Sequence, residues 1–140
     1  MKLELDSLKK AIFQLKGSLD MYNSELAESM PDTKKYFRSA AIQAFEYTYE
    51  LVFKMVKRRI VLSLENPKEV DDMTFNDIIR TAYGKNIVKS DVSVWCEYRK
   101  KRGIASHTCD ENKAQKVFES AVNFLDEARY ALFRLQELNK

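Results

Sequence analysis

Hydrophobic residues recur at every third or fourth position through the first 26 residues and predict one long amphipathic helix. They form a single stripe that consists of Leu5, Leu8, Ile12, Leu15, Leu19, Tyr22 and Leu26. The segment Met30-Pro31-Asp32-Thr33 ends this helix, because proline disfavours helical geometry in the residue before it. Asp32 or Thr33 is a good N-cap for a second helix, predicted from about residue 33 to about residue 63.

The second predicted helix is apolar over an unusually wide arc. One stripe contains Phe37, Ala41, Ala44, Thr48, Leu51 and Met55, and a neighbouring stripe contains Ile42, Phe45, Tyr49, Val52 and Val56. A helix that buries so much of its circumference lies at the centre of its bundle or is shared with a second subunit, and the pattern leaves both open. In the second case, an outward position such as Val52 would contribute to the subunit contact.

The middle of the chain predicts two shorter helices. Asn66-Pro67 marks a loop, and Thr74 followed by Asp77 has the spacing of a capping box that opens a short helix. Gly84 is suited to end this helix as its C-terminal cap. Another helix is predicted to begin near Asp91 and to run into the basic segment that follows.

A last long helix is predicted to begin between Cys109 and Glu111. Thr108 and Glu111 have capping-box spacing, and an apolar stripe follows. That stripe consists of Val117, Ala121, Phe124, Ala128, Ala131, Leu135 and Leu138. The chain is therefore predicted to be all-α, an antiparallel up-and-down four-helix bundle with an additional short helix, forming a single domain over residues 1–140.

The composition agrees with a folded helical protein: 45% of the residues are hydrophobic and 32% charged, with three glycines and two prolines. The net charge of +3 is compatible with local attraction to phosphates but does not establish nucleic-acid binding. Cys96 and Cys109 lack the spacing of a zinc site or a disulfide framework. No apolar run reaches the length of a membrane span, and the N-terminus has no signal-peptide pattern, so we expect a cytoplasmic protein that does not enter a membrane.

The stretch RKKRGIASHTCDENK, residues 99–113, contains the only histidine of the chain, His107. Gly103 indicates a helix end, which places His107 close to the start of the last helix. Unpaired N–H groups there favour an anion such as phosphate, and Arg102, with Arg99 one turn earlier, would supply positive charge. Taken alone, the same residues also fit a solvated helix end with an ordinary surface histidine.

Other residues with functional potential have simpler structural readings. Trp95 is expected in the core rather than as a stacking platform for nucleobases. Four cations of the second helix are expected on an exposed face rather than in a binding patch: Lys54, Lys57, Arg58 and Arg59. Neither observation on its own identifies a site.

The segment VWCEYRKKRGIASHTCDE, residues 94–111, resembles the R-x4-H region of the HEPN superfamily. It is most similar to the branch of nucleotidyltransferase substrate-binding proteins, which carry a stretch of the type W-x-x-x-x-x-x-R-N-x-x-S-H-x-Y-D-E. Residues 36–60, YFRSAAIQAFEYTYELVFKMVKRRI, resemble the long second helix of that branch. The resemblance covers roughly residues 5 to 138.

This resemblance implies a HEPN bundle that forms a homodimer and pairs with a small, separately encoded nucleotidyltransferase. Many such modules are toxin–antitoxin systems in which the HEPN subunit is an endoribonuclease that needs no metal or other cofactor. Arg102 and His107 would be the catalytic pair. Arg99, Ser106 and Thr108 would contact the phosphate of RNA or of a nucleotide.

Two positions depart from the pattern of the branch. Gly103 stands where relatives usually have a polar residue, and Cys109 stands where many have a tyrosine that the partner modifies with AMP. The nearest hydroxyl groups to that position belong to Ser106 and Thr108, so Ser106, Thr108 and Cys109 form a candidate modification segment. These departures favour the alternative of a non-catalytic subunit that presents a nucleotide or other substrate to the nucleotidyltransferase.

A single histidine also bears on assembly. Cleavage of RNA by its own 2′-OH needs a base, an acid and stabilisation of charge on phosphorus. One chain offers one imidazole, whereas a two-fold dimer offers two. A composite site at a dimer interface would also explain the wide apolar arc of the second helix, although a purely structural dimerising bundle is a further reading of the same pattern.

Overall fold

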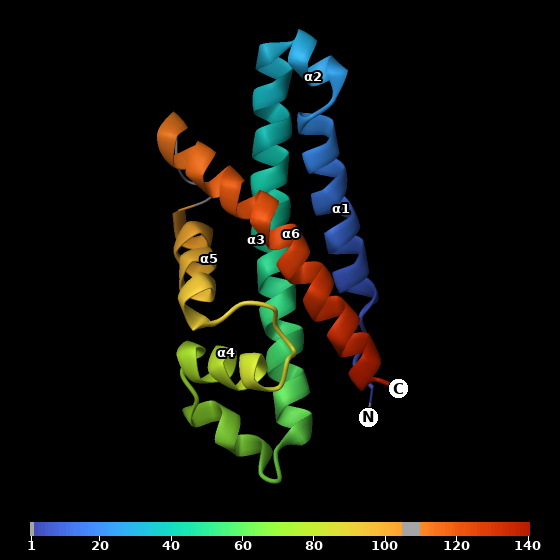
Figure 1. The fold of residues 1–140 in the computed structure, drawn as a ribbon, viewed down its shortest axis with the longest axis vertical. Coiled ribbons are helices and arrows are strands. Elements are labelled where there is room, and N and C mark those ends of the chain that lie inside the picture. Colours follow the sequence, from blue (N-terminus) through green and yellow to red (C-terminus); the bar gives the residue numbers. More distant parts are fainter. Residues whose placement is uncertain (1, 105–109) are drawn as a thin grey trace.

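The computed structural model describes residues 2–104 and 110–140 and confirms the predicted all-α helical bundle (Figure 1). In chain order the elements are α1 (Asp6–Tyr22), α2 (Glu25–Ser29), α3 (Pro31–Ser63), the 3₁₀ helix η1 (Pro67–Asp72), α4 (Phe75–Gly84), α5 (Val92–Ile104) and α6 (Glu111–Leu138). Helices α1 and α3 lie side by side and antiparallel, and α6 crosses them diagonally (Figure 1). α5 flanks α3 on the side away from α1, while α4 and η1 cover the lower end.

Helix α3 lies at the centre of the bundle, as the width of its apolar arc allows. It packs against α1, α2, α4, α5, α6 and η1. The expectation that Val52 faces outward is wrong: its side chain is 0% exposed and belongs to the core. The exposed ridge of α3 instead carries Tyr36 and Tyr47, and Val52 lies on the opposite side of the helix, because five residues advance the helix by about 140°.

The predicted long first helix is divided in two. Helix α1 ends at Tyr22 and α2 begins at Glu25, with Ser24 as the N-cap whose Oγ accepts a hydrogen bond from Ala27 N (3.2 Å). The Asn23 amide also donates to Leu19 O (3.1 Å). Side chains of this kind compete with helical hydrogen bonds and favour caps, so the apolar periodicity continues across a break that it does not reveal.

The capping predictions were correct at one helix start and wrong at three other helix ends. Thr74 and Asp77 form the predicted capping box of α4. At α3, Pro31 occupies the first turn and no side chain caps the helix, which agrees with the preference of proline for that position. At α4, Gly84 is the last helical residue, not the cap, and the left-handed backbone conformation occurs at Asn86 (φ 59°).

At α6, the N-cap is Asp110, not Thr108. The Asp110 carboxylate accepts hydrogen bonds from the N–H groups of Asn112 and Lys113. The Asn66-Pro67 loop continues into η1, with Asn66 as its N-cap.

Candidate functional site

A cluster of aromatic rings fixes α5 against the centre of the bundle. Trp95 is fully buried, as predicted, and its ring lies 5.8 Å from that of Tyr49 on α3 and 5.6 Å from that of Phe124 on α6. Tyr98 contacts Phe124 edge to face at 4.9 Å, and Phe45 contacts Phe124 at 5.4 Å. Such pairs add to the stability that burial alone provides, so they strengthen the contact of α5 with α3 and α6.

Arg102 projects from the same face of α5 as Trp95, because seven residues correspond to about two helical turns. Its guanidinium is held by two carboxylates of α3 that are one turn apart. Nη1 lies 3.4 Å from Glu46 Oε2, while Nε donates to Glu50 Oε1 (3.1 Å) and Nη2 also pairs with Glu50. The hydrogen bond to Glu50 raises the pKa of Arg102 further above its already high value, so the side chain remains a permanent cation.

The Arg102 guanidinium is nevertheless accessible, since its side chain is 31% exposed. It borders a pocket of about 390 Å³ between α3, α4 and α5, which we call the α3–α5 pocket. The pocket is lined by Tyr49, Glu50, Phe53, Lys57, Met73, Phe75, Ile78, Arg99 and Arg102. Two residues predicted to bind phosphate, Arg99 and Arg102, therefore lie at one concave surface.

The start of α6 is attached to α3 as well. Arg38 donates from Nη2 to Glu111 Oε2 (2.6 Å) and from Nη1 to Gln115 Oε1 (3.5 Å). This ion pair lowers the pKa of the Glu111 carboxyl group. Residues 105–109 thus join two helix ends that are both bound to α3, Arg102 near Glu46 and Glu111 near Arg38.

The remaining predicted site residues, Ser106, His107, Thr108 and Cys109, lie outside the described residues, and their roles stay predictions. Of the four cations expected on an exposed face of α3, Lys54, Lys57 and Arg58 are exposed and Arg59 is half-buried. Lys57 also lines the α3–α5 pocket, which the sequence reading did not anticipate.

Sequence reasoning missed the carboxylates that hold Arg102. A signal was available, since Glu46 and Glu50 stand four residues apart and therefore share one face of α3. It also missed Phe53 and Phe75, whose half-buried rings stack at 5.2 Å with an interplanar angle of 29°. No local pattern links these two residues, because α3 and α4 come together only in the folded chain.

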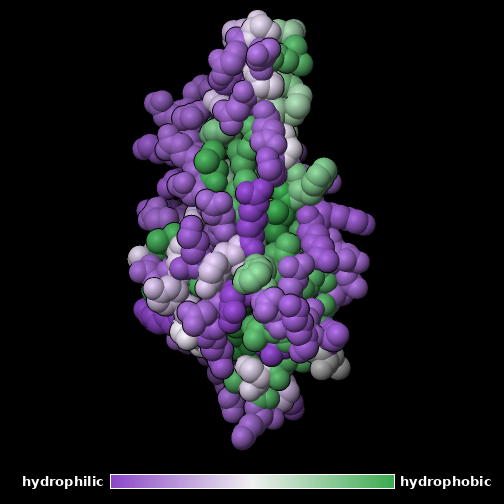
Figure 2. Space-filling model, turned by 45° about the vertical axis from the view of Figure 1, so that its right-hand side comes forward, coloured by the Kyte–Doolittle hydropathy of each residue, from purple (hydrophilic) through white to green (hydrophobic). Residues whose placement is uncertain are grey.

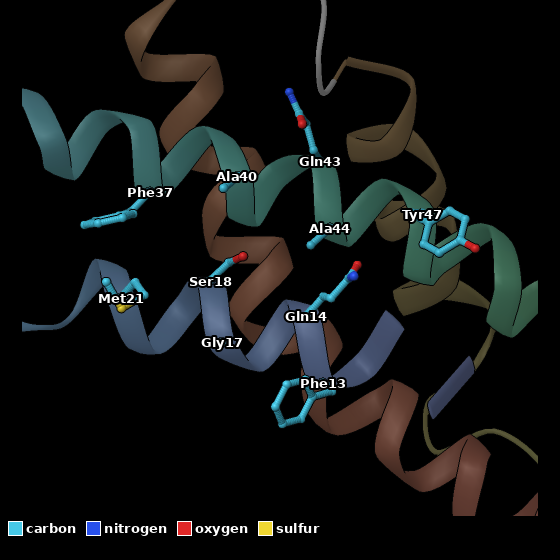
Figure 3. Close-up of a pocket in the computed structure, with 10 residues that line it drawn as sticks. All are labelled: Phe13, Gln14, Gly17, Ser18, Met21, Phe37, Ala40, Gln43, Ala44 and Tyr47. Carbon is cyan, nitrogen blue, oxygen red and sulfur yellow. The ribbon is translucent and has the colours of Figure 1, made fainter. Parts of the chain in front are cut away.

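A second concave surface lies between α1 and α3 and has a volume of about 610 Å³ (Figure 3). We call it the α1–α3 groove; it is lined by Phe13, Gln14, Gly17, Ser18, Met21, Phe37, Ala40, Gln43, Ala44 and Tyr47. Phe13 is 79% exposed and Tyr47 52% exposed, and Tyr36 nearby on α3 is 76% exposed. The space-filling view shows hydrophobic side chains at the surface in a strip along the long axis (Figure 2).

Within residues 2–104 and 110–140, no group of three or more His, Cys, Asp or Glu side chains is placed to hold a metal ion. None of the helices in these ranges combines the length and the hydropathy needed to cross a bilayer.

Comparison with known proteins places these features in a family. Residues 3–137 match the family model described as nucleotidyltransferase substrate binding protein like. A curated relative from Haemophilus influenzae, named probable ribonuclease HepT, is 37% identical over 102 residues, which span 73% of this chain and 69% of the relative. A solved Haemophilus influenzae structure, described as revealing the fold of a substrate binding domain of a nucleotidyltransferase, superposes with a TM-score of 0.87 at 31% identity, covering 95% of this chain and 99% of that one. The chain belongs to the nucleotidyltransferase substrate-binding family and has its HEPN-like helical fold.

Proposed function

We propose that this protein is the HEPN subunit of a two-component module with a small nucleotidyltransferase, and that it cleaves RNA without a metal ion. The observation that carries the proposal is the position of Arg102. A permanent cation is held at the edge of a pocket, three residues before a connection that contains the only histidine of the chain. The name of the curated relative, probable ribonuclease HepT, supports the same activity.

In the proposed reaction, the 2′-oxygen of a ribose attacks the adjacent phosphorus and the bond from phosphorus to the 5′-oxygen breaks. One His107 imidazole accepts the 2′-OH proton, and a second imidazolium donates a proton to the departing 5′-oxygen. Arg102 stabilises the negative charge that develops on the phosphate oxygens, for which a planar guanidinium is well suited. The products are a 2′,3′-cyclic phosphate and a free 5′-OH.

A second copy of the chain supplies the second imidazole in this scheme. We assign the contact between copies to the α1–α3 groove and the exposed ridge of α3. Tyr47 lies between Glu46 and Glu50 in the sequence, and these carboxylates hold Arg102, so the apolar surface continues to within one helical turn of the Arg102 site. A two-fold contact at this surface would place the Arg102 groups of both copies at one interface.

The assignment of this surface predicts that Phe13→Asp weakens association of the chain by at least about tenfold. A charge would be buried at the centre of the contact, and aromatic anchors often account for changes of this size or more. Phe133→Asp is the matched control, because Phe133 is a comparably exposed phenylalanine (57%) on α6 that does not line the groove. Analytical ultracentrifugation over a concentration series measures both. Equal dimerisation of the two variants, or a monomeric unaltered chain at micromolar concentration, would remove the α1–α3 contact from the proposal.

The activity itself is tested with purified chain and single-stranded RNA in the presence of EDTA. We expect cleavage, with 2′,3′-cyclic phosphate ends identified by mass spectrometry. An RNA carrying a single 2′-deoxyribose at a cleaved position should resist cleavage there, because the attacking hydroxyl is absent. Cleavage that requires a divalent metal ion, or products with 5′-phosphate ends, would contradict the proposed mechanism.

The second candidate is a non-catalytic subunit that presents a nucleotide or other substrate to the nucleotidyltransferase. The description of the superposed solved structure, a substrate binding domain, favours it. Gly103 also favours it, because it departs from the R-N-x-x-S-H stretch that this segment resembles. Binding of RNA or nucleotide, measured by fluorescence anisotropy, together with no cleavage in the assay described above would support this candidate over the ribonuclease.

A further inference from the structure

We propose that the α3–α5 pocket binds one nucleotide of single-stranded RNA beside the cleaved phosphate, with its base against Phe53 and Phe75 and its phosphate at Lys57 and Arg99. This inference rests on the proposed function and specifies the substrate class of the same site. It adds residues of α3 and α4 to the Arg102 site.

The first support is the aromatic wall of the pocket. Phe53 and Phe75 stack on each other, and both rings are only half-buried, so part of each ring faces the pocket they line. Exposed aromatic rings attract nucleobases, because every base has an apolar face that stacks on them. Both rings pack against the edge of the core, whereas Phe45, Trp95 and Phe124 lie inside it.

The second support is the charge at the pocket. Three cations and one carboxylate line it, and that carboxylate, Glu50, is already engaged with Arg102. Within the described parts of the chain, Lys57 and Arg99 form no ion pair with a carboxylate at 4.0 Å or less. The pocket therefore has an excess of positive charge that a phosphate group would neutralise.

The orientation of Arg99 fits this role. Its guanidinium carbon lies 4.6 Å from the centroid of the Phe75 ring. Stacking on an aromatic ring leaves the N–H donors in the guanidinium plane available, and those donors match two oxygens of a phosphate. The aromatic rings and the proposed phosphate contact are therefore adjacent, because Arg99 lies against Phe75.

The volume of the pocket and the accessibility of its aromatic rings indicate that the ligand is one nucleotide of a single strand. The volume of about 390 Å³ lies at the lower end of the range of about 300–1,000 Å³ for small-ligand pockets, which suits one nucleotide. A base inside a duplex cannot reach such a wall, because its faces are covered by its neighbours in the stack. Burial raises the pKa of Tyr49 to about 12, so its phenol adds no negative charge to the pocket at neutral pH.

The test measures binding of a short fluorescent single-stranded 2′-O-methyl RNA, which cannot be cleaved because its 2′-oxygen cannot attack. By fluorescence anisotropy, we expect Phe75→Leu to raise the Kd about tenfold, because Phe75 supports both the Phe53 ring and the Arg99 guanidinium, and loss of the stacking of one base has this order of effect. We expect Lys57→Ala to raise the Kd and to reduce the slope of log Kd against log salt by about 0.7, the value for one phosphate contact on a single strand. Lys54→Ala is the matched control, because Lys54 is an exposed cation on the same helix that does not line the pocket; its Kd should be close to that of the unaltered chain.

The outcomes separate this inference from the proposed ribonuclease activity. If Phe75→Leu and Lys57→Ala have the same Kd as Lys54→Ala and the unaltered chain cleaves RNA, the pocket assignment is wrong and the ribonuclease proposal is retained. If the pocket variants lose binding but the unaltered chain does not cleave RNA, the pocket is supported as a nucleotide-binding site and the proposed ribonuclease activity is contradicted. Equal affinity for a duplex of the same length would overturn the single-strand assignment. Circular dichroism shows whether Phe75→Leu is folded. Arg99→Gln changes an exposed side chain that lines the same pocket and should also raise the Kd.

Discussion

Arg102→Ala should lower the rate of metal-independent RNA cleavage by a factor of about 10² to 10³, the usual effect of removing one group that stabilises transition-state charge. His107→Ala should lower it by about 10² to 10⁴, the usual contribution of a general acid or base. Arg102→Lys should recover little of the loss, because an ammonium group cannot replace the two-pronged contact of a guanidinium with phosphate oxygens. An ammonium also cannot reproduce the fork that reaches both Glu46 and Glu50.

The control for these variants is Lys100→Ala, an exposed cation of α5 that does not line the α3–α5 pocket. Its cleavage rate should equal that of the unaltered chain. Thermal unfolding of each variant shows whether a loss of activity reflects a loss of fold; Arg102→Ala should retain the fold, although Glu46 loses its counter-charge. Undiminished cleavage by His107→Ala, in a preparation free of contaminating ribonuclease, would show that His107 is not a catalytic residue.

Mixing Arg102→Ala with His107→Ala tests the composite site directly. If each copy contributes one essential group to a shared centre, mixed dimers should regain part of the activity. If both histidines are required, mixed dimers should stay inactive. The formation of mixed dimers should be checked by native mass spectrometry, which separates them from both homodimers by mass, so that the absence of activity is not confused with the absence of mixed dimers.

The largest expected loss of stability comes from a residue outside the site. Glu127 on α6 is 1% exposed, and its Oε2 accepts hydrogen bonds from the backbone N–H groups of Lys89 (2.7 Å) and Ser90 (3.2 Å). Glu127→Ala would leave both N–H groups without their acceptor and open a cavity. Lys89 is exposed and Ser90 half-buried, so water replaces part of the lost hydrogen bonding. Hydrogen bonds to a charged acceptor contribute about 1.5–3 kcal/mol and a cavity adds to the loss, so the free energy of unfolding should fall by about 2 kcal/mol.

Urea denaturation of Glu127→Ala measures this change, and Glu119→Ala, an exposed glutamate on the same helix, is its control. The control should differ from the unaltered chain by less than about 0.5 kcal/mol, as exposed positions usually do. Glu127→Gln should lose much less than Glu127→Ala, because an amide oxygen can still accept from the N–H groups of Lys89 and Ser90. Equal losses for the alanine variants of Glu127 and Glu119 would show that the connection from α4 to α5 does not depend on this anchor.

The helical bundle could be predicted because apolar spacing and capping act within one element. The capping box of Thr74 and Asp77 is an example, since all of its donors and acceptors come from four consecutive residues. The division between α1 and α2 could not be predicted in the same way. The spacing of Leu19, Tyr22 and Leu26 continues through the break, and only the side-chain hydrogen bonds of Asn23 and Ser24 disclose it.

The candidate site could be predicted only in part, because its residues come from helices that are distant from one another in the sequence. Arg99 and Arg102 belong to one stretch of sequence whose resemblance to a family identifies them, and α5 brings them to one pocket. Their partners come from α3 and α4, separated along the chain by tens of residues, and no spacing rule connects such positions. Glu127 shows the same limit in the core. It lies beside the apolar stripe of α6, and its role as a hydrogen-bond acceptor depends on the connection between α4 and α5.

The aromatic cluster has a practical consequence for spectroscopy. Trp95 is the single tryptophan of the chain, is fully buried, and lies on the face of α5 that also carries Arg102. Its ring neighbour Tyr49 lines the α3–α5 pocket, so one intervening side chain separates the indole from anything bound there. Tryptophan emission therefore originates from one known position next to the candidate site, and its wavelength and intensity report on that place without a label.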